Sequence, residues 1–224
     1  MDGDNIKFTM GCSRCQHPIR MAVVSTYHHG NLRAALVEAA ADLARATGPD
    51  GVVLREVARQ TGVSHNAAYR HFTDRQELLD AVAALAMDRL EEAMLSRIDT
   101  VTGDDPGTVA RRRLREVGVA YVTFALAEPG LFEVAFAADE PRPTAPEPSK
   151  GGPYGVLGRV LDELVAAGEL TEKRRQGADV VCWAAVHGFA MLHLHGPLRG
   201  TPPDLRDVPL GLLLDTVDRG LTRQ

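Results

Sequence analysis

The sequence of 224 residues has only three cysteines and no long apolar run. Three cysteines cannot build the multi-bridge framework of a small secreted domain. A membrane helix needs about 20 apolar residues, and a signal peptide needs an apolar central region that residues 1–20 lack. We therefore expect a cytoplasmic protein that does not enter a membrane.

The motifs of common catalytic sites are also missing. The sequence contains no GxSxG nucleophile elbow, P-loop, dinucleotide fingerprint or HExxH zinc motif. Its acidic residues and histidines are scattered over amphipathic segments, which is typical of solvated helix faces. We expect a protein that is not an enzyme and carries no cofactor.

Cys12 and Cys15 form a CxxC pair with His17 nearby. A closed zinc site needs four ligands, whereas this segment offers three at most. It also lies outside the βαβ pattern of CxxC redox proteins. We expect no metal site and interpret residues 1–26 as a disordered extension. The alternative, a small helical metalloenzyme, predicts stoichiometric metal in the purified protein.

The charge is unevenly distributed along the chain. The formal net charge is -5, yet residues 21–75 hold six arginines against five acidic residues, a local charge of +1. The acidity therefore lies elsewhere, and a small positive surface is enough for a dimeric protein that reads DNA.

Residues 54–72 predict two short helices joined by a tight turn at Gly62. Apolar side chains recur at helical spacing in both, and Ser64 is a good N-cap for the second helix. Ala68 and Phe72, four residues apart, should face inward. The pattern is that of a helix-turn-helix, and its simpler alternative is a surface pair of helices with a solvated polar face.

The outer side of the second helix carries side chains that suit DNA. Asn66 can pair with adenine and Arg70 with guanine, each through two hydrogen bonds. Hydroxyl, imidazole and guanidinium groups also suit phosphate oxygens. The residues that we assign to phosphates are Arg55, Ser64, Tyr69, His71 and Arg75.

Three segments strongly resemble the TetR family of bacterial regulators: YHHGNLRAALVEAAADLARATG at 27–48, LREVARQTGVSHNAAYRHF at 54–72 and TDRQELLDAVA at 73–83. The resemblance implies that the recognition helix spans residues 64–72. It implies that the side chains facing bases are those of His65, Asn66, Ala67 and Arg70.

Two positions depart from the family pattern. Val53 stands where relatives often have Ser or Thr, so it can neither cap the helix that follows nor donate a hydroxyl to a phosphate. Arg75 stands where the family usually has Lys, which keeps the charge but changes its geometry. Both changes are expected to retune affinity and to leave the assignment intact.

The whole chain is predicted to be all-α. We expect an N-terminal three-helix DNA-binding domain over 30–90 and a larger C-terminal helical domain for ligand binding and dimerisation over 91–224. A mobile proline-rich loop is expected at 139–153. The helices predicted after the helix-turn-helix span 74–98, 109–127, 129–137, 154–167, 171–195 and 209–222.

Aromatic and methionine side chains of the C-terminal domain sit among few charges, which suits an apolar effector pocket. The candidate lining residues are Met94, Tyr121, Phe124, Phe132, Phe136, Trp183 and His187. Trp183, His187 and Gly188 also resemble the signature of the C-terminal domain in a subset of TetR regulators. The alternative is that these side chains only fill the core, with His187 as a satisfied core histidine.

The last two long helices are predicted to form a two-fold dimer. The segment 209–222 carries an apolar stripe that one subunit has limited means to cover, and small residues in 171–195 allow close helix packing. The expected interface residues are Ala184, Gly188, Met191, Leu210, Leu213, Leu214, Val217 and Leu221.

These patterns predict a homodimeric transcription regulator, most simply a repressor released from a pseudo-palindromic operator by an unidentified small molecule. The long helix at 74–98 would transmit the ligand signal, since its two ends pack on different cores. The alternative is a helical ligand-binding or scaffolding protein whose DNA-binding head is vestigial.

Overall fold

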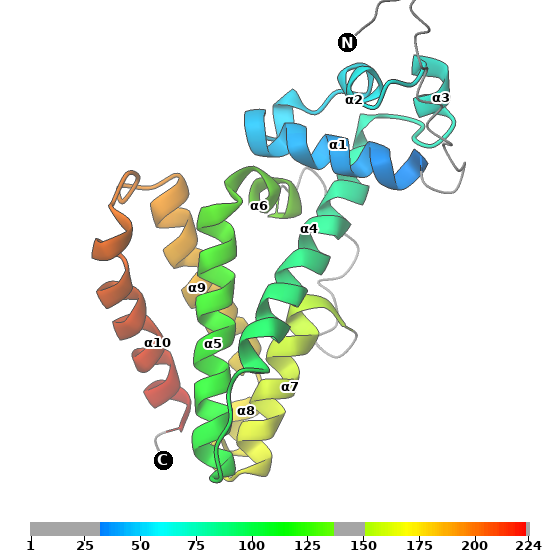
Figure 1. The fold of residues 1–224 in the computed structure, drawn as a ribbon. Coiled ribbons are helices and arrows are strands. Elements are labelled where there is room, and N and C mark those ends of the chain that lie inside the picture. Colours follow the sequence, from blue (N-terminus) through cyan, green and yellow to red (C-terminus); the bar gives the residue numbers. More distant parts are fainter. Residues whose placement is uncertain (1–31, 137–150, 223–224) are drawn as a thin grey trace, which may run out of the picture.

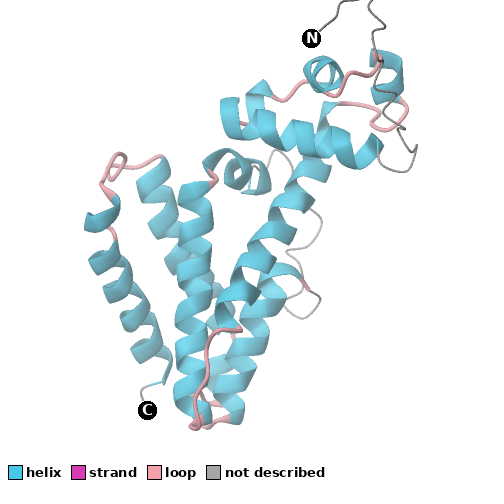
Figure 2. Cartoon of the chain, in the orientation of Figure 1, coloured by secondary structure: helices cyan, strands magenta, loops and turns pink. Residues whose placement is uncertain are grey.

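The computed structural model describes residues 32–136 and 151–222. Every regular element in these two ranges is a helix, as predicted, and Figure 2 shows them joined by short loops. The predicted extension at 1–26, with Cys12, Cys15 and His17, lies outside the described residues, as does most of the predicted loop at 139–153.

The N-terminal helices form a small unit, here called the head: α1 (Leu32–Thr47), the 3-10 turn η1 (Pro49–Gly51), α2 (Leu54–Gln60) and α3 (His65–Tyr69). The helix-turn-helix prediction is confirmed in its elements, because α2 and α3 are separated by a turn in which Gly62 has φ 70°. The buried side chains that hold these helices together include Leu36, Val57, Ala68 and Phe72.

The helix α4 (Arg75–Ile98) runs from the head into a larger bundle, here called the body (Figure 1). The body consists of α5 (Pro106–Ala127), α6 (Pro129–Phe136), α7 (Gly152–Ala166), α8 (Glu172–Arg175), α9 (Ala178–Leu194), η2 (Pro203–Leu205) and α10 (Asp207–Thr222). The central helix is α5, which packs against α4, α7, α9 and α10. In contrast, α10 stands at one edge of the bundle, against α5 and α9.

Side-chain caps explain where α3 and α4 begin. The Ser64 hydroxyl accepts the backbone N–H of Ala67 (3.2 Å) and so caps α3. The Asp74 carboxylate accepts the N–H of Glu77 (2.8 Å) and so caps α4. The Glu77 carboxylate reaches back to the N–H of Thr73 (2.7 Å), and this bond lowers the pKa of Glu77. Each cap satisfies an N–H group that has no partner within its helix.

The prediction of one continuous helix over 171–195 is wrong. The structure ends α8 at Arg175 and begins α9 at Ala178, and Gly177 between them has φ 79°. A left-handed residue cannot continue a right-handed helix, and glycine adopts this conformation without a steric cost. Elsewhere α5 begins at Pro106 and not at residue 109, because Asp105 caps it and proline fits the first turn.

The head and the body meet where the start of α6 packs on the end of α1. A Cβ atom on Gly130 would lie 1.9 Å from the carbonyl oxygen of Ala44. No other residue fits there unless a helix moves, because the atom it would meet belongs to the backbone. Two ion pairs flank this junction: Arg45 with Glu128 (2.6 Å) and Arg89 with Glu38 (2.6 Å).

Among the described residues, no single helix is both long enough and apolar enough to cross a membrane. Taken together, α5 and α6 reach those limits, but the chain bends by 108° between them.

The N-terminus of α2 offers a test of how local capping sets the stability of the head. Val53 occupies the N-cap position with extended backbone (φ -127°, ψ 136°) and no side-chain cap bond. Val53→Thr keeps the branched shape and adds a hydroxyl acceptor, so it should raise the free energy of unfolding by about 0.5–2 kcal/mol in urea titrations. Ser64→Ala, which removes the existing cap of α3, should lower it by a similar amount. Equal stability of the Thr variant and the parent would contradict this account.

Candidate DNA-binding surface and effector pocket

The recognition helix α3 presents polar side chains outward. His65, Asn66 and Arg70 are exposed, while Ala68 behind them is buried in the core of the head. The rings of His65 and Tyr69, one turn apart, lie with their centroids 4.4 Å from each other. Ala67 is half-buried, so only part of its methyl group faces outward. The structure therefore brings the residues assigned to bases onto one side of the head.

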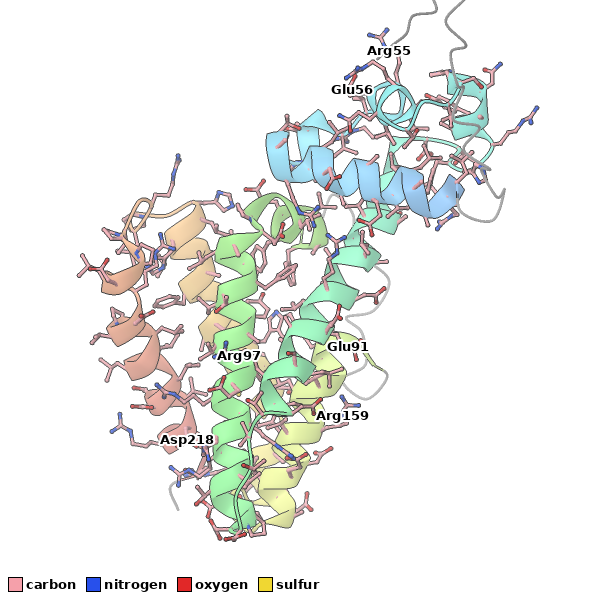
Figure 3. All side chains as sticks on the ribbon, viewed as in Figure 1. Arg55, Glu56, Glu91, Arg97, Arg159 and Asp218 are labelled. Carbon is pink, nitrogen blue, oxygen red and sulfur yellow. The ribbon has the colours of Figure 1, made fainter. Side chains whose placement is uncertain are left out.

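The residues assigned to phosphates surround this helix. Arg55 is exposed and points away from the head (Figure 3). Tyr69 is 44% exposed and His71 is half-buried. Ser64 is exposed, and its hydroxyl oxygen already accepts the N–H of Ala67, which leaves the hydroxyl proton to donate elsewhere.

Arg75, which is predicted to contact a phosphate, has hydrogen-bond partners inside the head. Its guanidinium donates to the carbonyl oxygens of Val52 (2.8 Å) and Pro49 (2.6 Å) and lies 3.9 Å from the carboxylate of Asp50. These bonds direct the side chain at η1 and the residue that follows it. The structure therefore gives Arg75 a positioning role, in which it holds the 49–52 segment against the start of α4.

Two further arginines of the head have partners of their own. Arg59 donates two hydrogen bonds to Glu56 (2.8 and 2.5 Å), and this contact lowers the pKa of the Glu56 carboxyl. Arg33 on α1 lies 4.9 Å from the centroid of the Phe72 ring. The Arg33 contact could not be predicted from the sequence, because spacing along the chain does not show that α1 lies next to the end of α3.

The body contains a pocket of about 370 Å³ between α5 and α10. Its inner wall is formed by apolar side chains of α4, α5, α7 and α9, together with the face of α10 that points inward. Three of the predicted lining residues take part: Met94, Tyr121 and Trp183. The pocket volume lies within the range that is usual for small-molecule sites.

The other four predicted lining residues, Phe124, Phe132, Phe136 and His187, do not line this pocket. Phe132 and Phe136 pack around Tyr121, whose hydroxyl shares a hydrogen bond of 2.8 Å with Nδ1 of His187. Burial raises the pKa of Tyr121 and lowers that of His187, so both groups are neutral near pH 7. This part of the prediction needs correction: these side chains belong to an aromatic cluster beside the pocket, and His187 has a partner there.

Charged side chains at the mouth of the pocket were not predicted. Arg111 on α5 donates to Asp218 on α10 (2.6 Å) and contacts Glu169 (3.4 Å). Arg115, one turn further along α5, pairs with Asp215. All five of these residues line the pocket. From the sequence, the acidic residues among them were assigned to solvated helix faces, because the partners on α5 and α10 are about a hundred residues apart and no local pattern links them.

Cys182 also lines the pocket, and it is buried. Burial raises the pKa of its thiol to about 12. The thiolate is the reactive form of cysteine, so this side chain contributes to the wall as a small apolar group.

The predicted dimer surface divides into two parts. On α9, Ala184, Gly188 and Met191 are exposed, next to Val181 and Leu192. On α10, the predicted stripe instead faces the same chain: Leu214 and Leu221 are buried, while Leu210, Leu213 and Val217 are half-buried against the core. The outward apolar residues of α10 are Val208 (78% exposed) and Leu212 (62% exposed).

The α10 stripe was misassigned because amphipathicity shows that a helix has an apolar face but not what covers it. In the folded chain α5 and α9 cover this face, and Gly118 leaves room for it. A Cβ atom on Gly118 would lie 2.5 Å from a methyl carbon of Leu214.

Comparisons with known proteins agree with this architecture. Residues 36–82 match the family of bacterial regulatory proteins called tetR, and residues 114–217 match the tetracyclin repressor-like C-terminal domain. The nucleoid occlusion factor SlmA of Vibrio vulnificus is 31% identical over 105 residues, which is 46% of this chain and 50% of that protein. The chain thus spans about half the length of the curated relatives that it matches.

Solved structures show the same fold over most of the chain. A protein of unknown function from Rhodococcus sp. RHA1 is 33% identical with a TM-score of 0.70, covering 89% of this chain and all of that one. A TetR variant from Acinetobacter baumannii AYE in complex with minocycline is 21% identical with a TM-score of 0.59, covering 84% and 94%. A TetR-family regulator from Pectobacterium atrosepticum is 20% identical with a TM-score of 0.61, covering 87% and 96%.

The helix-turn-helix, the helical body and the two family matches lead to one conclusion: the chain belongs to the TetR family of DNA-binding transcriptional regulators, which are not enzymes.

Proposed function

We propose that this regulator is a homodimeric repressor that leaves a pseudo-palindromic operator when a small molecule binds to its body. The observation that carries the proposal is the pairing of an outward polar face on α3 with a pocket in the body to which the head is joined. A regulator of this kind acts on chromosomal DNA in the cytoplasm.

In this proposal His65, Asn66, Ala67 and Arg70 face the edges of bases in the major groove. Asn66 and Arg70 carry most of the sequence preference, because each can form two hydrogen bonds with one base. Arg55, Ser64, Tyr69 and His71 contact phosphates and set the position of the helix on the duplex. Arg75 acts through the 49–52 segment that it holds.

The proposed dimer forms through the outward faces of α9 and α10. Val181, Leu192, Val208 and Leu212 are large apolar side chains that the single chain leaves exposed. Ala184 and Gly188 lie between Val181 and Leu192 on α9, and their small size allows a partner helix to approach closely. A two-fold dimer would place two recognition helices in successive major grooves, about 34–36 Å apart.

Ligand control needs a mechanical route from the pocket to α3. The head touches the body through α4 and through the junction of α6 with α1. Met94 on α4 and Tyr121 on α5 line the pocket, and Tyr121 packs on Phe132 of α6. A ligand that favours one arrangement of these helices shifts the spacing of the two heads and thereby weakens operator binding. A relative with this fold, the TetR variant from Acinetobacter baumannii, holds minocycline.

The competing function is a helical ligand-binding protein whose head no longer reads DNA. It predicts poor retention on DNA even at low salt, where phosphate contacts are strongest. Selection of bound genomic fragments, including the DNA that flanks the protein's own gene, distinguishes the two functions and yields the operator.

Sequence readout is tested by single substitutions on α3. Asn66→Ala and Arg70→Ala should each weaken binding to the selected operator by about 1–3 kcal/mol and leave weak binding to unrelated DNA largely intact. Tyr69→Phe and Arg55→Ala should weaken binding to all sequences alike. Arg59→Ala is the matched control, because Glu56 already neutralises that guanidinium. If competition titrations give one pattern for all four variants, the division into base and phosphate contacts is wrong.

The dimer surface is tested by comparing two leucines on α10. Leu212→Glu places a charge on the exposed side, so the variant should remain helical by circular dichroism but be monomeric by light scattering. Leu214→Glu should instead destabilise the fold by more than about 3 kcal/mol, because it buries a charge within one chain. A Leu212→Glu protein that is still dimeric would place the interface elsewhere.

The junction of α6 with α1 is tested by adding one carbon atom. Gly130→Ala must push α6 away from the Ala44 carbonyl, and operator affinity should fall about 5-fold or more, the lower end of typical coupling between sites. Gly155→Ala in α7 is the control, because its Cβ atom would have no neighbour within 4 Å. Unchanged operator affinity in a folded Gly130→Ala protein would show that this junction does not transmit the ligand signal from the pocket to α3.

A further inference from the structure

Some polar groups at the mouth of the pocket have hydrogen-bond partners and others do not. The guanidinium groups all have acceptors: Arg111 binds Asp218 and Glu169, Arg115 binds Asp215, and Arg112 donates to the carbonyl oxygen of Thr102 (3.1 Å). An anionic ligand would therefore have to break an ion pair before it could bind Arg111 or Arg115, whereas the acceptor of Arg112 is an uncharged backbone carbonyl.

One acceptor in the pocket remains unsatisfied. The Oδ2 atom of Asp218 accepts from Arg111, but its Oδ1 atom is buried and has no hydrogen-bond partner among the described residues. Asp218 lines the pocket, at the point where α10 approaches α5 (Figure 3). A buried carboxylate oxygen without a donor is costly, and a donor supplied by a ligand would remove that cost.

The wall next to this carboxylate suits an apolar group. Trp183 and Tyr121 both line the pocket, with their ring centroids 4.9 Å apart, and Trp183 is stacked on Tyr154 at 3.7 Å. Leu114 and Met94 add aliphatic surface. The pocket thus offers an apolar wall and, at its mouth, a negatively charged oxygen that lacks a donor.

We propose that the pocket takes an amphipathic amine, with its ammonium group donating to Oδ1 of Asp218 and its apolar body against Trp183. The inference rests on the proposed function, since it names the chemical class of the effector. An uncharged alcohol of the same shape donates to the same oxygen without the charge, and a carboxylate has no proton to donate to Oδ1 and is repelled by the charge of Asp218. The ammonium adds the attraction of opposite charges to the hydrogen bond that the alcohol also forms, and this attraction should raise affinity about ten-fold.

The test compares three small probes that share a cyclohexyl body: 2-cyclohexylethylamine, 2-cyclohexylethanol and cyclohexylacetate. Trp183 is the only tryptophan in the chain, so its fluorescence reports on the pocket, and calorimetry provides a second readout. The full-length protein should bind the amine about ten-fold more tightly than either of the other probes. Equal binding of the amine and the carboxylate, or no binding of any probe, would overturn the inference.

Variants assign the preference to one side chain. Asp218→Asn removes the charge and should abolish the preference for the amine over the alcohol. Asp162→Asn is the matched control: it breaks the Asp162 bridge to Arg175 (2.7 Å), which lies outside the pocket, and should retain the preference. If Asp218→Asn keeps the preference, the assignment is wrong. If it fails to fold, Val186→Phe fills the pocket from α9 and should abolish binding of the amine.

Operator affinity, measured on the same samples, separates this inference from the proposed function. Amine binding that leaves the operator bound supports the inference and contradicts effector control. Ligand-controlled operator binding without a preference for amines contradicts the inference alone.

Discussion

The contact between Gly130 and the carbonyl group of Ala44 sets where the body stands relative to the head, because neither side can yield without moving a helix. Interiors packed this closely transmit displacement instead of absorbing it. The sharp bend between α5 and α6 brings the start of α6 onto α1. A single residue separates α5 from α6, so the central helix of the body is connected directly to the helix that contacts the head. The orientation of α3 relative to the body therefore depends on a junction that lies outside α3.

A displacement at the junction of α6 with α1 can reach α3 only if the head is rigid. The recognition helix spans only His65–Tyr69, and helices this short are not stable alone. Ser64 caps it, Ala68 and Phe72 anchor it in the core, and Arg75 ties the 49–52 segment to the start of α4. An arginine that was predicted to contact a phosphate thus supports the segment next to the side chains that are proposed to contact DNA.

The pocket and the proposed dimer surface share a helix. The inner side of α10 supplies Leu214 and Asp218 to the pocket, while its outer side presents Val208 and Leu212. Because α10 lies at the edge of the bundle and packs mainly on α5 and α9, it has fewer contacts to restrain it than the central helices. A ligand bound between α5 and α10 would change the position of α10 relative to α5. It would thereby also move the outer surface of α10, on which the partner subunit is proposed to pack.

Features that depend on neighbouring residues could be predicted from the amino-acid sequence. Helical periodicity located the long helices, Ser64 and Asp74 marked the starts of α3 and α4, and Gly62 marked the turn between α2 and α3. The helix-turn-helix could be predicted for the same reason, because its caps and its inward residues lie within a few positions of one another.

Contacts between residues far apart in the chain became visible in the folded structure alone. The apolar stripe of α10 was visible in the sequence, but its burial against α5 and α9 was not. Arg75 reaches Val52 across 23 positions and Arg111 reaches Asp218 across 107. The physical reason is that caps and periodicity act over one or two helical turns, whereas ion pairs and buried faces depend on how the helices pack, which no local pattern records.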